Sequence, residues 1–94
     1  MFSGGTYDEV ARWLGNFLTS HAKRENARAE VELDARDERK GKSYAARLRL
    51  GERVTPLLEF EFSDVAQNRG SLQWCASLAA RVCEVVRDLD AAAA

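Results

Sequence analysis

The residues best suited to chemistry are one histidine, two cysteines and two pairs of closely spaced acids. A catalytic histidine works with a nucleophile and an orienting acid, whereas His21 falls among apolar positions at the end of a predicted helix, so we interpret it as a packed or capping side chain. Cys75 and Cys83 with this one histidine supply too few ligands for a tetrahedral zinc site. On one predicted helix they lie about 12 Å apart, too far for a disulfide, so we expect free thiols.

The acidic pairs Glu30/Glu32 and Glu59/Glu61 would suit acid–base catalysis only if one carboxyl kept its proton. The arginines of the stretch Arg47–Leu50 favour charged carboxylates nearby, so neither pair is a good general acid. The sequence also lacks glycine-rich phosphate loops and the G-x-S-x-G elbow. We therefore expect no catalytic residue, no cofactor and no metal site, and a protein that is not an enzyme.

Composition bounds the class of protein. The chain has 94 residues, 46% hydrophobic and 31% charged, with a formal net charge of −1, as expected for one small folded domain. We predict a single domain over 1–94, with an ordered core at about 6–90 and flexible ends at 1–5 and 91–94. No apolar stretch is long enough to cross a bilayer, and the N-terminus does not resemble a signal peptide. We therefore expect a cytoplasmic protein with no membrane contact.

The elements that must position these residues begin with a helix. Thr6–Glu9 has the pattern of a capping box, in which the Thr6 hydroxyl accepts from the backbone of Glu9. Helical spacing then predicts a helix at about 7–24. Its apolar face comprises Val10, Trp13, Leu14, Phe17, Leu18 and His21.

Alternating charged and apolar residues predict three strands, at about 28–36, 43–50 and 54–62. A charged turn and a three-residue turn at 51–53 join them into an antiparallel meander. Pro56 has no N–H to donate, so the third strand should lie at an edge of the sheet. The residues expected to point inward are Ala29, Val31, Leu33, Ala35, Tyr44, Ala46, Leu48, Leu50, Val54, Leu58, Phe60 and Phe62.

A second helix follows, beginning somewhere within 63–71 and running to about Leu89. The predicted fold class is therefore α+β: a two-layer sandwich of order α-β-β-β-α, with a three-stranded antiparallel meander and both helices on one face.

The central strand is basic and its neighbours are acidic, which predicts a register. Loop lengths place Glu32 opposite Arg47 and Glu30 opposite Arg49. On the other side Arg47 would face Leu57, with Glu59 on the diagonal. Opposite charges across strands contribute about 0.2–1 kcal/mol each. We interpret this outer face as self-neutralising rather than as a surface that grips nucleic acid.

The second helix carries apolar residues over roughly 200° of its circumference, more than one core contact needs. Trp74, Leu78 and Val85 lie at one margin of this arc, and Leu57 is the large apolar residue of the outer sheet face. These four residues are the candidate partner interface, because aromatic residues are enriched in interface cores. The first strand is a second candidate, as an unprotected edge. We expect a protein–protein interaction module that forms a homodimer and binds an unknown protein partner.

Two alternatives remain open. The element order resembles that of double-stranded-RNA-binding domains, over about Thr6 to Leu89, which implies RNA contacts from the first hairpin loop and the start of the second helix. The residues at those places are Arg39, Lys40, Lys42 and Arg69, without the family's Gly-Pro-x-His or Lys-Lys-x-Ala-Lys. The low net charge makes nucleic acid the less favoured partner. A small-molecule cavity among Phe60, Tyr44 and Trp13 is the least favoured function.

Overall fold

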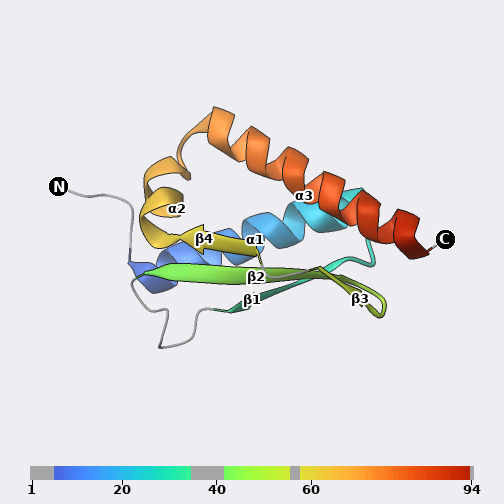
Figure 1. The fold of residues 1–94 in the computed structure, drawn as a ribbon. Helices are drawn as coiled ribbons and strands as arrows, with labels where there is room; N and C mark the ends of the chain where they lie inside the picture. The colour runs from blue at the N-terminus through green and yellow to red at the C-terminus, as the bar shows by residue number, and fades with distance from the viewer. Residues whose placement is uncertain (1–5, 35–41, 56–57, 94) are drawn as a thin grey trace.

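The computed structural model describes residues 6–34, 42–55 and 58–93. The predicted α+β class and order of helices and strands are confirmed, and the helices lie against an antiparallel sheet (Figure 1). The elements are α1 (Tyr7–Glu25), β1 (Glu30–Asp34), β2 (Ser43–Leu50), β3 (Arg53–Val54), β4 (Leu58–Glu61), α2 (Phe62–Asn68) and α3 (Leu72–Ala93).

The start of α1 follows from its sequence. Thr6 is the N-cap, and its Oγ1 accepts a hydrogen bond from the Glu9 amide at 3.2 Å, which satisfies one of the amides that a helix start leaves unpaired. Acidic residues in the first turn and basic residues in the last turn also suit the helix dipole. The face of α1 that is buried against the sheet carries Tyr7, Val10, Leu14, Leu18 and Ala22.

β2 is the central strand and matches its predicted bounds. β1 pairs with it along one side, with Glu30 opposite Arg49 and Glu32 opposite Arg47, which confirms the predicted register. β1 is shorter than the predicted 28–36, and Ala35 lies outside the described residues. The core between sheet and helices includes Val10, Leu14, Leu18, Tyr44, Leu48, Val82 and Val86.

The turn after β2 differs from the prediction. Leu50 pairs with Arg53, so the loop has two residues rather than three. Gly51 supplies the positive φ of 66° that the first position of a two-residue type II′ loop requires. The shorter loop shifts β3 by one residue and places Val54 opposite Arg49, on the outer face. The prediction that Val54 points inward is therefore wrong, and Val54 is 39% exposed.

The predicted third strand is divided into β3 and β4. β4 pairs with β2 in the predicted register, with Leu58 opposite Ala46 and Glu59 opposite Ala45. One extra residue between the two pairings makes a β-bulge. Thr55 holds the bulge to Leu48: the Thr55 amide donates to the Leu48 carbonyl at 2.9 Å, and the Leu48 amide donates to Thr55 Oγ1 at 3.0 Å. Pro56 and Leu57 lie outside the described residues.

The second predicted helix is two helices. Phe62, expected as the last inward residue of a strand, is the first residue of α2, where its ring packs edge-on against Tyr7, with centroids 5.7 Å apart. Ser71 Oγ then accepts from the Trp74 amide at 3.3 Å and caps α3. α3 continues to Ala93, beyond the predicted end near Leu89.

Candidate functional site

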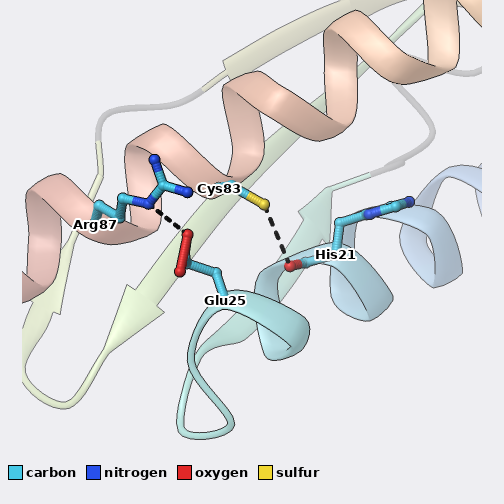
Figure 2. Close-up of polar contacts among 4 residues, drawn as sticks. All are labelled: His21, Glu25, Cys83 and Arg87. Atoms are coloured by element: carbon cyan, nitrogen blue, oxygen red, sulfur yellow. Dashed lines mark hydrogen bonds and ion pairs between the residues drawn. The ribbon is translucent and has the colours of Figure 1, made fainter.

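One side of α3 packs against α1. The two helices run in the same direction (Figure 1), and matched residues meet along them. Trp74 stacks on Trp13 with ring centroids 6.3 Å apart. Further along (Figure 2), Cys83 Sγ donates to the His21 carbonyl at 3.9 Å, and Arg87 Nε donates to Glu25 Oε1 at 2.6 Å. We call this contact the α1–α3 seam.

The other side of α3 borders an open groove above the sheet. One cavity of about 440 Å³ lies between β4, α2 and the first half of α3. A second, of about 290 Å³, lies between β3, β4 and the second half of α3. We call the two together the α3–β4 groove. The apolar residues that line it from the inner face of β4 and from the helices are Leu58, Phe60, Val65, Trp74, Leu78, Val85 and Leu89.

Most apolar side chains of the groove are only partly covered. Leu58 and Phe60 lie on the inner face of β4, because they pair with the inward residues Ala46 and Tyr44, yet both remain half-buried, as do Val85 and Leu89. α3 packs chiefly on α1, with smaller contacts to β2 and β3. α3 therefore covers β4 less than it covers β2 or β3.

The charged rim of the groove is mainly acidic. Glu59, Glu61 and Asp64 line the first cavity and Asp88 lines the second, against the single basic residue Arg81. Glu61, Asp64 and Asp88 are exposed, and none of these three makes an ion pair with another described residue. A ligand in the groove would therefore meet apolar surface at its base and negative charge along its rim.

Three of the four residues predicted as a partner interface line this groove. Trp74 and Val85 are half-buried, whereas Leu78 is 8% exposed and already packed within the chain. Leu57 lies outside the described residues. The helical arc thus pointed to the side of α3 that borders the groove. It did not identify Leu58 and Phe60, whose strand alternation had assigned them to a closed core.

The structure describes two of the four basic residues predicted to contact nucleic acid. Lys42 is exposed, and its carbonyl accepts from the Phe62 amide at the start of α2. Arg69 is half-buried at the end of the same short helix. Arg39 and Lys40 lie outside the described residues.

The sheet end near α2 is closed by two tyrosines. Tyr7 and Tyr44 stack with centroids 4.5 Å apart. The Tyr44 hydroxyl donates to the Tyr7 carbonyl at 2.7 Å, and the Tyr7 hydroxyl donates to the Ser43 carbonyl at 2.5 Å. Burial raises the pKa of Tyr44 well above its usual value, with smaller contributions from Tyr7 and Asp8. Of the three residues expected around a small-molecule cavity, Tyr44 is fully buried, whereas Phe60 and Trp13 are half-buried.

The side chains with chemical potential are spread across the fold. His21 packs its ring on Phe17, with centroids 4.4 Å apart, and both cysteines are free and half-buried. In the described part of the chain, no three His, Cys, Asp or Glu side chains are grouped as a metal site requires. Within that same part, no helix has the length and apolar character needed to span a membrane.

Comparison of the chain with protein-family models, with curated proteins and with solved structures gives no match. The resemblance to double-stranded-RNA-binding domains therefore stays at the order of elements.

Proposed function

We propose that this protein is a non-enzymatic module that binds another polypeptide in the α3–β4 groove. The single observation that supports the proposal is the groove itself: half-buried apolar side chains of α3 and β4 face each other across two cavities. Grooves of this shape, between a helix and the edge strand of a sheet, suit a peptide segment.

The energetics favour a partner over water. A partner that fills the groove would bury the exposed parts of Trp74, Val85, Leu58 and Phe60. Each Å² of apolar surface removed from water stabilises the complex by about 25 cal/mol. Trp74 has a fixed position, because it stacks on Trp13, so little side-chain entropy is lost when a partner packs on it. Partly covered, preorganised aromatic residues of this kind are typical anchors of protein interfaces.

A selection experiment tests the proposal. Extended peptides of random sequence would be displayed and selected on the immobilised full chain, and recovered peptides would be measured against variants. Val85→Lys places a charge on the groove side of α3, and its long stem can reach water without unfolding the helix. Ala80→Lys is the matched control, since Ala80 is exposed on the same helix and lies outside the cavity linings.

The proposal expects binding that Val85→Lys weakens at least tenfold and that Ala80→Lys leaves unchanged. Circular dichroism and thermal melting would show that both variants are folded. Peptides that bind both variants as tightly as the wild type would place the site elsewhere and overturn the proposal.

The homodimer and the nucleic-acid alternative stay predictions. Sedimentation velocity at micromolar concentration tests the first: a dimer that Trp74→Asp dissociates would support it, and a monomer would remove it. A gel-shift series with duplex RNA and DNA tests the second, because phosphate contacts give an affinity that falls steeply with salt. No shift at low salt would end that alternative.

A further inference from the structure

From the groove and the strand beside it, we infer that the partner is an extended segment that pairs with the edge of β4 facing away from β2 and alternates apolar with basic residues. This inference rests on the proposed function, since it names the occupant of the same groove. Three features support it: the edge of β4, the two sides of that strand, and the charge of its neighbours.

β4 has an edge that can accept another strand. Among the described residues it pairs with β2 alone. Half of the backbone N–H and C=O groups of such a strand point away from its partner, and unpaired edges readily add a strand from another chain. β4 is four residues long, about 13 Å, which suits a short segment.

Apolar and acidic residues alternate along β4, and this pattern determines which residues suit each position of the bound segment. Residues opposite each other on neighbouring strands share a face of the sheet. Side chains opposite Leu58 and Phe60 would therefore point inward, toward the cavities beneath α3. Side chains opposite Glu59 and Glu61 would point outward, beside carboxylates. The complementary pattern has apolar residues at every second position and basic residues between them.

The charges around the groove select the same partner. Glu61 lies at the end of β4, with Asp64 one helical turn beyond and Asp88 on α3 at the other end. Arg81 is the one basic residue in the linings of the two cavities. A basic segment would neutralise this rim, and an acidic segment would be repelled by it.

The other side of the same sheet contains an example of this pairing. β1 carries acids at alternate positions and pairs with the stretch Arg47–Leu50, which alternates arginine with leucine. There Arg49 Nη2 lies 2.8 Å from Glu32 Oε1, a diagonal ion pair on the outer face. An acidic strand of this protein therefore accepts an Arg-Leu-Arg-Leu strand, and β4 presents its outer acids in the same alternation.

A second folded copy fits this edge poorly. Two β4 strands paired about a two-fold axis would bring Glu59 and Glu61 beside their own counterparts, and like charges across strands are destabilising. Pairing β4 with β1 of another copy would again set acids against acids. Among the strands that the structure describes, the basic alternating strand is β2, which is central in the sheet, between β1 on one side and β3 and β4 on the other. A folded copy cannot offer it.

The test uses synthetic hexapeptides and the full chain. The probe is Lys-Val-Lys-Val-Lys-Val; one control reverses the charge, Glu-Val-Glu-Val-Glu-Val, and the other keeps the composition in blocks, Lys-Lys-Lys-Val-Val-Val. Trp13→Phe leaves Trp74 as the only tryptophan, so its fluorescence reports occupation of the groove. Titrations of each peptide into this variant give the affinities.

The inference expects the alternating basic probe to bind at least tenfold more tightly than either control, and more weakly as salt is raised. Glu61→Gln with Asp64→Asn should weaken it about threefold to tenfold, from two lost charge pairs. Glu84→Gln with Asp90→Asn makes the same change of net charge at residues that do not line the α3–β4 groove and should leave the affinity unchanged.

Each contrary result has a distinct meaning. If the acidic probe binds as tightly as the basic one, the claim that the partner is basic is wrong. If the block peptide binds as tightly as the alternating one, the claim that the partner pairs as a strand is wrong. The proposed function would survive either result if Val85→Lys still abolished binding of selected peptides. A complex of two protein chains without peptide that slows amide exchange along β4 would overturn the argument against a second copy at this edge.

Discussion

α3 has two sides that look alike in sequence and differ in structure. On the α1–α3 seam, partly exposed side chains meet specific partners: Trp13 and Trp74 stack, and Arg87 pairs with Glu25. On the α3–β4 groove, half-buried side chains such as Val85 and Leu58 face cavities. Partial exposure alone therefore does not identify a binding surface. What distinguishes the groove is that nothing in the described chain fills the space opposite its apolar residues.

The largest effect on stability should come from comparing a valine of α3 in the core with a valine of α3 beside the groove. Val82→Ala, at a position 1% exposed, should lower the free energy of unfolding by about 2–3 kcal/mol, because a buried methyl pair is lost and a cavity forms. Val85→Ala, three residues away and half-buried beside the groove, should cost less than about 1 kcal/mol. Urea unfolding measures both, and equal costs would mean that the groove side is as tightly packed as the core.

The bulge at the groove's edge should give the next largest effect. Thr55→Val keeps the shape of the side chain and removes the oxygen that accepts from the Leu48 amide. We expect a loss of about 1–2 kcal/mol, since a buried amide is left without a partner. Thr55→Ser, which keeps the hydroxyl, should lose less in the same unfolding assay. Two equal losses would show that the hydrogen bond does not hold the bulge.

The stability contributed by Tyr44, at the end of the sheet near α2, should depend on pH. Its pKa is raised in the folded state, so the unfolded chain loses the phenol proton first, near pH 10. Above that pH the unfolded state binds fewer protons than the folded state, and stability falls as pH rises. Tyr44→Phe should cost about 1 kcal/mol at neutral pH through the lost bond to the Tyr7 carbonyl. The substitution should also reduce the loss of stability at high pH. Denaturation measured from pH 8 to 11 would follow this loss, and an unchanged pH profile would show that it does not come from Tyr44.

The smallest effect belongs to the ion pair of the seam. The Arg87 side chain is 70% exposed, and exposed pairs contribute about 0.2–1 kcal/mol. A double-mutant cycle of Arg87→Ala and Glu25→Ala should give a coupling in that range that shrinks with added salt. A coupling above about 2 kcal/mol would show that this contact, rather than the packing of rings and cysteines, holds α3 to α1.

Local signals in the sequence predicted much of the fold. Thr6 and Glu9 marked the start of α1, and alternating charges with a fixed loop length gave the pairing of Glu30 with Arg49. These predictions succeeded because each depends on residues that are close in the chain or repeat with a fixed period.

The missed features depend on contacts that are distant in sequence. The two-residue turn at Gly51 and the bulge at Thr55 offset each other, so the loop length alone gave the wrong register for β3 and the right one for β4. Phe62 begins a helix because its ring packs on Tyr7 and Tyr44.

The groove was only half predicted for the same reason. The apolar arc of α3 pointed to Trp74 and Val85, but the open side depends on where α1 holds the helix over the sheet. The pairing of α1 with α3 joins residues about sixty positions apart, and no local pattern encodes it. Leu58 and Phe60 therefore looked like ordinary core residues.

Amide hydrogen exchange of the two sheet edges tests the central claim most directly. The exchange rates of β4 and β1 would be measured with and without a peptide recovered by selection on the protein. A partner strand in the α3–β4 groove should slow exchange along Leu58–Glu61 and leave Glu30–Asp34 unchanged. Slowed exchange at β1 alone, or no change at either edge in a saturated complex, would contradict the account.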